Sequence, residues 1–365
     1  MTARHTAESD AGAAIRRVEG HRRRFDVCFE AYFDSLARQL DTPPMSRFTP
    51  RCLELLRDLS LRGGNRLRVA LLYEAARLVT PGDVPGLEPA ALSIELLQTH
   101  GLIHDDIIDD SPVRRGGPST YYAYRDEHPD RPGTALGLAV LAGDLAAFLS
   151  VRVLLDAGLP ARLCQSLMDV HLRAATETVT GQVVDLERDL HAVPGEELLH
   201  TVTDYKSARY SILAPLRMGL LAAGEDPAPY DRTLSRYARL AGIGGQLRDD
   251  YLDLFGTEEA QAKSAGSDIR AGRRSYAVSA VLAAATPTES ALVEAALGDP
   301  GCPDETIGRV RAIARRHGVD DRLRADMRRH AQAAATETSR WPRHWRPEAV
   351  GFFRRLPLWA VSRLP

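Results

Sequence analysis

The chain has 365 residues and a mass of 40.0 kDa, so it can bury a large core as one big domain or as two. Hydrophobic residues make up 44% of it, charged residues 26%, and the formal net charge is −2. This is the composition of a soluble globular protein, and it gives no indication of nucleic acid as a partner. The four cysteines lack the spacing of metal ligands, so we expect reduced thiols in a cytoplasmic protein.

Residues 1–20 are polar and rich in arginine, with no apolar core for a signal peptide, and we expect a flexible N-terminal tail. The longest apolar stretch, residues 135–155, is interrupted by Asp144 and Arg152, which argues against a transmembrane segment. No low-complexity linker follows, so residues 21–365 are expected to form a single all-α domain.

Helical periodicity dominates the rest of the chain, and no convincing run of alternating β-branched residues is present. A polar loop is expected at 256–272. From residue 341 onward Pro342, Pro347 and Pro357 predict an irregular segment with one short helix near 349–355. The predicted helices cover residues 18–40, 52–59, 67–78, 89–110, 133–157, 162–191, 196–223, 230–254, 275–285, 289–297, 304–317 and 321–337.

Four aspartates crowd the end of the apolar helix at 89–110: Asp105, Asp106, Asp109 and Asp110. Carboxylates there face the negative end of the helix dipole, and Asp105 and Asp109 lie on the same face, as do Asp106 and Asp110. Like charges held so close raise one another's pKa unless a cation lies between them. A divalent-metal site is one interpretation, and an acidic, solvated helix end is the other.

The same D-D-x-x-D spacing returns as Asp249, Asp250 and Asp253, again at the end of an apolar helix. Two such clusters can face one another across a helical bundle and hold metal ions between them. Magnesium prefers carboxylate and phosphate oxygens and keeps several waters, so it is usually shared between a few carboxylates and a substrate phosphate.

Basic residues near both clusters favour a phosphate ligand. Only two of the 47 basic residues are lysines, Lys206 and Lys263, and both flank the acidic clusters. For any single arginine a solvated surface position remains an alternative. The arginines concerned are Arg66 and Arg68 at a helix start, Arg114 and Arg115 after the first cluster, and Arg273 and Arg274 after the second.

Taken together and in order, these motifs resemble the trans-isoprenyl diphosphate synthases (polyprenyl synthetases) over about residues 62–275. The resemblance implies an all-α helical bundle around a deep central cavity, usually a homodimer, that joins isopentenyl diphosphate to an allylic diphosphate. The matching stretches are Gly63–Arg68, Glu95–Gln98, Asp105–Asp109, Arg114–Gly116, Leu141–Asp144, Gly181–Gln182, Lys206–Ser207, Gln246–Asp253, Lys263 and Gly266–Asp268.

The resemblance also implies roles for individual residues. Two or three magnesium ions would be bound directly by Asp105, Asp109 and Asp249, with Asp106, Asp250 and Asp253 in support. The allylic diphosphate would contact Arg114, Lys206, Ser207, Gln246 and Lys263, and Arg273 stands where a lysine is usual. Isopentenyl diphosphate would be bound by Arg68, Gln98 and Arg115.

The chain departs from the family pattern at Asn65, where a lysine is usual. Loss of a charge-assisted bond to phosphate costs roughly 1.5–3 kcal/mol, so affinity for isopentenyl diphosphate is expected to fall unless Arg66 compensates. Gln98 stands where histidine is common, and Gly245 replaces an aromatic residue, which changes the expected local shape of the cavity.

His100 and Gly101 lie one turn before the first aspartate, where the family places the floor under the growing chain. Their sizes favour a geranylgeranyl product, with farnesyl next. The alternative is that His100 is a core histidine and that the floor lies deeper. Two other functions remain open: a class I terpene cyclase on the same fold, which the lost charge at Asn65 favours, and a non-catalytic partner subunit of another prenyl synthase.

Overall fold

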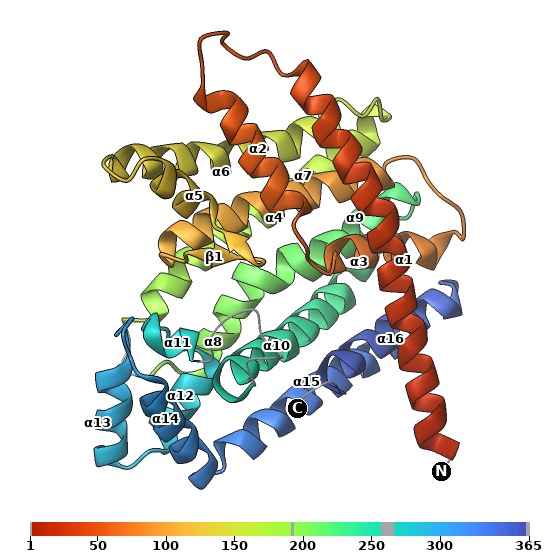
Figure 1. The fold of residues 1–365 in the computed structure, drawn as a ribbon. Coiled ribbons are helices and arrows are strands. Elements are labelled where there is room, and N and C mark those ends of the chain that lie inside the picture. Colours follow the sequence, from red (N-terminus) through yellow and green to blue (C-terminus); the bar gives the residue numbers. More distant parts are fainter. Residues whose placement is uncertain (1, 191–192, 257–265, 363–365) are drawn as a thin grey trace. The chain divides into compact units, whose positions relative to one another are not determined.

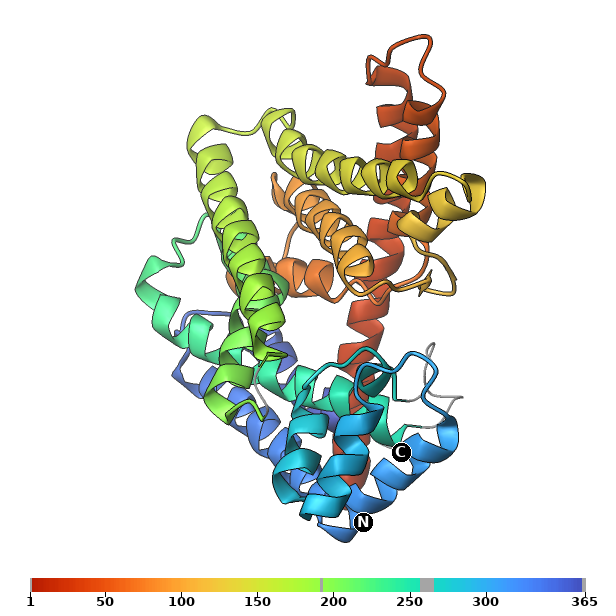
Figure 2. The same cartoon turned by 90° about the vertical axis from the view of Figure 1, so that its left-hand side faces the viewer.

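A computed structural model describes residues 2–190, 193–256 and 266–362, and this part of the chain is almost wholly helical (Figures 1 and 2). Its strands are two residues each, β1 (Val113–Arg114) and β2 (Gly117–Pro118), paired antiparallel. The expected all-α fold class is therefore confirmed.

The chain forms two compact units, each described here by itself. The N-terminal unit comprises residues 12–173 and 214–227, and the C-terminal unit comprises residues 1–11, 174–213 and 228–365. Each unit is assembled from separated stretches of sequence, and the expectation of a single domain over residues 21–365 remains a prediction.

Within the N-terminal unit, α4 packs along α6, and α3 packs against α9. Gly219 makes the second contact possible, because a Cβ atom at this position would lie 2.2 Å from the carbonyl oxygen of Leu72. The helices that contribute to the unit are α1 (Thr2–Gln39), α2 (Phe48–Leu61), α3 (Leu67–Val79), α4 (Leu87–Ile108), α5 (Thr120–Glu127), α6 (Pro132–Leu155), α7 (Ala161–Arg188) and α9 (Ala214–Ala222).

Residues 2–20 form the first half of α1, and the expected flexibility of this segment stays a prediction. Farther along, α1 contacts Glu74 of α3, whose carboxylate is fully buried. Arg17 Nε donates to Glu74 Oε1 at 2.9 Å, and His21 Nε2 lies 2.7 Å from the same oxygen. Because a buried carboxylate needs compensating partners, this contact ties α1 to α3 from Arg17 onward.

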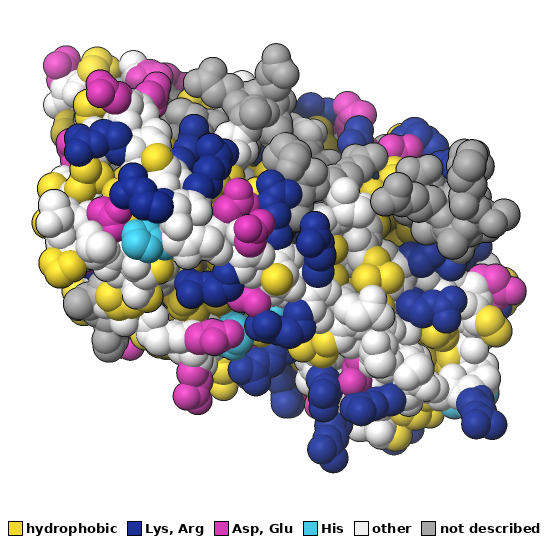
Figure 3. Space-filling model, turned by 90° about the horizontal axis from the view of Figure 1, so that it is seen from below, with side chains coloured by type: hydrophobic (Ala, Val, Ile, Leu, Met, Phe, Trp, Pro, Cys, Tyr) yellow, Lys and Arg dark blue, Asp and Glu magenta, His cyan; other side chains and the backbone are white. Residues whose placement is uncertain are grey.

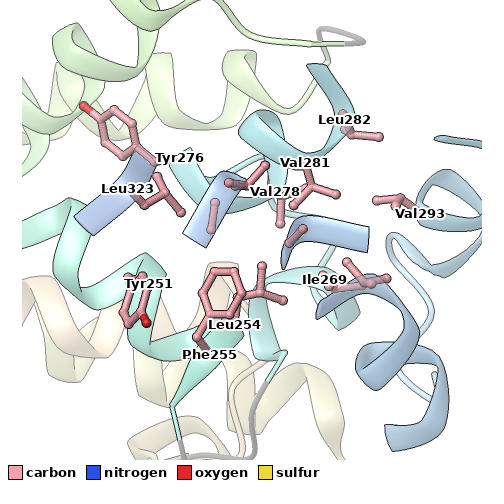
Figure 4. Packing of buried hydrophobic residues seen from close by; sticks show 14 of the residues in the cluster. Tyr251, Leu254, Phe255, Ile269, Tyr276, Val278, Val281, Leu282, Val293 and Leu323 are labelled. Carbon is pink, nitrogen blue, oxygen red and sulfur yellow. The ribbon is translucent and has the colours of Figure 1, made fainter. Parts of the chain in front are cut away.

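The C-terminal unit is built around α10, which packs against η1, α12, α15 and α16. Figure 4 shows part of its apolar core, where Tyr251, Leu254 and Phe255 of α10 lie near Val278 and Val281 of α12. The elements are α8 (Glu196–Val202), η1 (Thr203–Leu213), η2 (Ala228–Tyr230), α10 (Asp231–Phe255), α11 (Ser267–Arg270), α12 (Tyr276–Ala284), α13 (Pro287–Ala296), α14 (Asp304–Arg316), α15 (Val319–Glu337), η4 (Thr338–Arg340) and α16 (Pro347–Ser362).

The C-terminal segment is more regular than its prolines predict. In place of one short helix near 349–355, α16 runs for 16 residues and contains Pro357. Phe352, Phe353 and Leu356 are buried, and Tyr237 of α10 donates its hydroxyl to the Phe353 carbonyl at 2.9 Å. Burial of this apolar face offsets the helix-breaking tendency of the proline.

Candidate active site

The first aspartate cluster occupies the C-terminal end of α4. Asp106 is fully buried and accepts a 2.7 Å bond from Arg114 Nε, while Arg114 Nη2 lies 3.4 Å from Asp105 Oδ2. Asp105 and Asp109 are half-buried. The buried carboxylate therefore fixes the loop that carries Arg114, and Asp105 and Asp109 share a helical face.

Arg114 and Arg115 are presented by the β1–β2 hairpin, whose turn residues are Arg115 and Gly116. Both have positive φ, 52° and 76°, as a type I′ hairpin turn requires. The Arg115 side chain lies against Gly64, where a Cβ atom would be 3.2 Å from its Nη2, and Arg115 Nη1 donates to the Leu59 carbonyl at 3.2 Å. Gly64 thus makes room for a guanidinium group beside it.

Several arginines of the N-terminal unit converge on this hairpin. Burial lowers the pKa of Arg115; the charge of Glu95 opposes that shift. The positive charges of Arg66, Arg68 and Arg114 lower the pKa of Arg115 further. Gln98 of α4, in the same unit, is buried. Guanidinium groups that repel one another in this way form a site that an anion would stabilise.

Arg66 belongs to this cluster but is occupied structurally. Its side chain is buried, and its three nitrogens donate to Asp26 Oδ1 at 2.8 Å, Glu95 Oε2 at 2.7 Å and the Ser60 carbonyl at 2.7 Å. These contacts tie α1, α2 and α4 together. The structure therefore gives no support to the idea that Arg66 replaces the charge missing at Asn65.

Asn65 has a structural role of its own at the start of α3. Its Oδ1 accepts a 3.1 Å bond from the backbone N–H of Leu67, and the residue is exposed. An asparagine side chain can satisfy one of the unpaired N–H groups at a helix start, which a lysine side chain cannot do.

His100 lies on the side of α4 that faces α6. Its Nδ1 is 3.1 Å from the carbonyl oxygen of Gly143, and its ring centroid is 4.5 Å from that of His104. A Cβ atom at Gly143 would lie 2.1 Å from the His104 ring, so this glycine permits both histidines to pack on α6. Burial, and then the neighbouring His104, lower the pKa of His100.

The second group of predicted residues lines a pocket within the C-terminal unit, and η1 supplies its cations. This segment is a π-helix, a form that is rare and often marks functional sites. It is approached closely from both sides, because Cβ atoms at Gly181 of α7 and Gly242 of α10 would lie 2.3 Å from Lys206 N and 2.5 Å from Ala208 Cβ. The pocket is lined by Lys206, Ser207, Gln246, Asp250 and Arg273, all predicted, and by Asp185, Arg188, Asp268, Ser275 and Tyr276.

Carboxylates of this pocket are held by hydrogen bonds. Asp250 is buried and accepts from Gln246 Nε2 at 2.8 Å and from the backbone N–H of Tyr276 at 2.7 Å. Burial, followed by the charge of Asp268, raises the pKa of Asp250 well above its usual range. Burial and the charge of Asp253 raise the pKa of Asp268 to about 6. Crowded acids of this kind are stabilised by a bound cation.

Asp253 is bound to the start of α11. Its carboxylate accepts from Ser267 N at 3.1 Å, Ser267 Oγ at 2.5 Å and Asp268 N at 3.1 Å. Asp249, in contrast, has a side chain that is 68% exposed, with an ion pair to Arg248 at 3.3 Å. Of the three aspartates in the second motif, Asp249 is therefore the one whose oxygens are accessible to a ligand.

The donor set fits magnesium by type. In the part of the chain that the structure describes, no group of three or more His, Cys, Asp or Glu side chains forms a closed metal cage. Magnesium does not require one, because it retains water molecules and is commonly bound by one or two carboxylates together with phosphate oxygens. The accessible carboxylates Asp105, Asp109 and Asp249 fit that mode.

One predicted ligand, Lys263, lies outside the described residues. The sequence interpretation assigned no role to Asp185 or Arg188, which form an i, i+3 ion pair on α7 at 2.5 Å. Their spacing could have predicted this ion pair, since oppositely charged side chains three residues apart lie next to one another on a helix. No sequence pattern indicated that the backbone N–H of Tyr276 donates to Asp250.

Comparisons with known proteins agree with this geometry. Residues 49–313 match the family model described as polyprenyl synthetase. A geranylgeranyl diphosphate synthase of Sulfolobus acidocaldarius is 29% identical over 298 residues, 80% of this chain and 86% of that one. A farnesyl diphosphate synthase of Geobacillus stearothermophilus is 32% identical over 243 residues, 64% and 76% of the two chains.

The crystal structure of geranylgeranyl pyrophosphate synthase from Corynebacterium glutamicum, complexed with isoprenyl diphosphate and magnesium, matches with a TM-score of 0.82. It is 26% identical in sequence and covers 97% of this chain and 99% of its own. The chain belongs to the polyprenyl synthetase family. Within that family it is a trans-prenyltransferase, an isoprenyl diphosphate synthase.

Proposed function

We propose that this enzyme condenses isopentenyl diphosphate with an allylic diphosphate, in the presence of magnesium, to give a short-to-medium-chain trans-prenyl diphosphate. The observation that carries the proposal is the pocket in which Lys206, Ser207, Gln246 and Arg273 meet Asp250. Cationic and amide groups of this kind bind a diphosphate, and the adjoining carboxylates need a cation before an anion can approach.

The allylic diphosphate is the ligand of this pocket. Lys206 supplies the charge, and its ammonium group is held 2.6 Å from Asp185 Oδ2 before any ligand binds. Ser207 and Gln246 add neutral hydrogen bonds, and Arg114 and Lys263 complete the set proposed from the sequence. When magnesium is bound, by Asp105, Asp109 and Asp249 with Asp106, Asp250 and Asp253 in support, it acts as a Lewis acid toward the departing diphosphate.

Isopentenyl diphosphate is assigned to the arginine cluster of the N-terminal unit. Arg68 and Arg115 provide the charges, and Gln98 a hydrogen bond. Burial lowers the pKa of Arg115 most, and the charges of Arg66, Arg68 and Arg114 lower it further. A bound diphosphate relieves the repulsion among these charges. At Asn65 the phosphate-binding charge is absent, and the side chain instead accepts a hydrogen bond from the Leu67 N–H at the start of α3.

The reaction proceeds by ionisation, condensation and proton elimination. The C–O bond of the allylic substrate breaks, and both bonding electrons leave with the diphosphate. The double bond of isopentenyl diphosphate then attacks the allylic cation, and a C–C bond forms. Finally a proton is lost to the released diphosphate. The enzyme's residues hold donors where negative charge develops, so the leaving group is stabilised without reorganisation.

We propose geranylgeranyl diphosphate as the main product and farnesyl diphosphate as the next. Two features support this choice: the match to a geranylgeranyl diphosphate synthase, and the position of His100 one turn before Asp105, fixed against α6 by its bond to Gly143. A histidine ring held in that position limits the space for a longer chain, whereas Gly101 adds no side chain.

A second copy of the chain is proposed to cover α6. Among the described residues this is the one helix with the length and composition of a membrane span, with a mean hydropathy of 2.0 and 39% of that window buried. Leu141, Phe148 and Leu155 are 62%, 73% and 53% exposed and follow one another at intervals of seven residues. An apolar stripe of this kind favours a helix–helix interface and therefore a homodimer. We also propose a cytoplasmic location.

The decisive assay incubates the purified protein and magnesium with isopentenyl diphosphate and dimethylallyl, geranyl or farnesyl diphosphate, followed by mass analysis of the products. Elongated diphosphates are expected, with geranylgeranyl diphosphate dominant. Hydrocarbons formed from the allylic substrate alone would instead identify a class I terpene cyclase. Absence of any product with all three allylic substrates would identify a non-catalytic partner subunit.

A further inference from the structure

A groove of about 700 Å³ lies in the C-terminal unit, where the start of α10 meets the segment between α15 and α16. It shares no residue with the pocket around Lys206. Four arginines line it: Arg232 and Arg236 from α10, and Arg340 and Arg343 from the C-terminal segment. Its volume lies within the roughly 300–1,000 Å³ typical of small-molecule sites.

Two of these arginines are fixed from below by Glu337. This carboxylate is only 5% exposed, and its Oε2 lies 3.2 Å from both Arg236 Nε and Arg340 Nη1. Its Oε1 accepts a 2.8 Å bond from Thr233 Oγ1. The two arginine side chains remain 59% and 61% exposed. Each guanidinium group is thus oriented through one nitrogen, while the rest of it faces the groove or solvent.

The charges of the groove do not balance. Elsewhere exposed arginines pair with carboxylates, as Arg152 does with Asp156 and Arg173 with Asp169. Figure 3 shows one face of the molecule, on which Lys and Arg side chains are numerous and some lie beside acidic ones. Arg232 and Arg343 are exposed, and no carboxylate among the described residues pairs with either of them. Glu337 is the single acidic residue lining the groove, against four arginines. Arginines without counter-ions in a concave site raise the local concentration of anions.

One side of the groove is aromatic. Tyr230 and His344 line it, and the buried Trp345 lies beneath, with ring centroids 5.0 Å from Tyr230 and 6.4 Å from His344. Tyr230 comes from η2, whereas His344 and Trp345 belong to the Arg- and Trp-rich segment that begins at Trp341, to which the catalytic reaction assigns no role. A concave site with fixed guanidinium groups fits a planar or tetrahedral oxyanion with several charges better than it fits a flat bilayer.

We infer that this groove is a second anion site, distinct from the catalytic pocket, for a small ligand that carries a diphosphate or two phosphate groups. Arg236 and Arg340, oriented by Glu337, bind the anion from the floor of the groove. Arg232 and Arg343 close on it from the rim. Released inorganic diphosphate and a prenyl diphosphate both present this chemistry.

The test uses tryptophan fluorescence of the full-length protein. All three tryptophans of the chain, Trp341, Trp345 and Trp359, lie in the C-terminal segment that builds the groove, so their emission reports on this region without any turnover. The protein is titrated with sodium diphosphate in EDTA at constant ionic strength, which removes the metal on which tight binding at the catalytic pocket depends. A saturable change in emission is expected. A parallel titration with geranylgeranyl diphosphate shows whether the prenyl chain adds affinity.

The matched variants decide the origin of the signal. Arg232→Gln with Arg343→Gln is expected to weaken diphosphate binding by at least about tenfold while product formation stays unchanged. Arg162→Gln with Arg309→Gln removes the same charge from exposed positions outside the groove and is expected to titrate like the wild type. Equal titration of the groove variant and the wild type overturns the inference. So does a response to phosphatidylglycerol vesicles but not to soluble diphosphate, which would indicate a membrane surface.

Discussion

Lys206 and Asp185 form an ion pair, with Lys206 Nζ 2.6 Å from Asp185 Oδ2, inside the pocket assigned to the allylic diphosphate. The other oxygen of Asp185 is bound by Arg188 Nη1 at 2.5 Å. Arg188 in turn bonds both oxygens of Asp189 at 3.0 Å, and Asp189 accepts from the backbone N–H of Arg274 at 2.8 Å. A continuous chain of contacts therefore sets the position of the lysine.

Replacing Arg188 should break this series of contacts between Asp185 and Asp189. In Arg188→Met, Asp185 keeps only Lys206 as a partner, and the lysine is drawn toward the carboxylate and away from the diphosphate. We expect KM for the allylic substrate to rise about tenfold or more while KM for isopentenyl diphosphate stays within about twofold, because we assign the latter to the arginine cluster of the other unit.

The control for Arg188 is Arg188→Lys, which keeps the charge and should restore part of the affinity. Steady-state kinetics with each substrate varied in turn separates positioning from simple destabilisation. An equal rise in both KM values, together with a lower melting temperature, would show that Arg188 only maintains the fold.

Restoring the family's lysine at Asn65 should strengthen the binding of isopentenyl diphosphate. Asn65→Lys adds a charge at the start of α3 but removes the bond from Leu67 N to the asparagine Oδ1. We expect KM for isopentenyl diphosphate to fall about tenfold, and the free energy of unfolding to fall by about 1 kcal/mol because the hydrogen bond to the Leu67 N–H is lost. Asn65→Ala loses this hydrogen bond without gaining the charge and is the matched control. A KM that does not fall in Asn65→Lys contradicts the proposed role of this position.

His100 is predicted to limit product length. In His100→Ala the bond to the Gly143 carbonyl and the ring itself are lost, and the space opened on this side of α4 should admit at least one further isoprene unit. His104→Ala is the control, since His104 also packs on α6 and lies close to Gly143. Products are compared by mass after complete consumption of farnesyl diphosphate. Unchanged product length in His100→Ala would leave this residue as a core histidine.

The motifs predicted the chemistry of the site better than its supporting contacts. Aspartate spacing and the two lone lysines indicated a metal- and diphosphate-binding enzyme, because those residue types are needed wherever a diphosphate departs. The sequence did not predict the π-helix that carries Lys206, because its register depends on the close approach of Gly181 and Gly242 from other helices. The structural use of Arg66 was equally hidden, since Asp26 and Glu95 are distant in sequence.

Helix boundaries failed where tertiary packing overrides local propensity. The prolines near the C-terminus predicted irregular structure, yet burial of Phe352 and Phe353 supports a helix through Pro357. Arg17 shows the same effect, because the polar composition around it did not indicate the buried Glu74 that it binds.

The exposed stripe of α6 predicts a dimer that a single charge should break. Phe148 is 73% exposed, and burying an aromatic side chain of this size against a second copy stabilises the dimer by about 1.5–3 kcal/mol. Phe148→Asp should therefore shift the protein from dimer to monomer in size-exclusion chromatography with light scattering. Val27→Asp, at a position of α1 that is 70% exposed, is the matched control and should leave the dimer intact. Equal behaviour of the two variants would place the interface elsewhere.

His171 should make the stability of the enzyme depend on pH. Its ring is buried between two hydroxyl groups, with Nδ1 2.9 Å from Ser93 Oγ and Nε2 2.9 Å from Ser150 Oγ. Burial lowers the pKa of His171 to about 4 from an ordinary value of 6.5. The unfolded chain therefore binds this proton at a higher pH than the folded one does. The part of the free energy of unfolding that depends on the neutral His171 ring is complete above pH 6.5. It is lost as the pH falls toward 4, and the total loss is about 3 kcal/mol.

The test compares the free energies of unfolding of the wild type and His171→Gln at pH 7 and pH 5. The variant loses packing and is less stable at pH 7, but it lacks the titrating group. All other titrating groups are common to both proteins. The difference in free energy of unfolding between wild type and variant should therefore be about 2 kcal/mol smaller at pH 5 than at pH 7. A difference that stays constant would mean that His171 is hydrated or already protonated in the folded enzyme, and that the two serines do not hold it neutral.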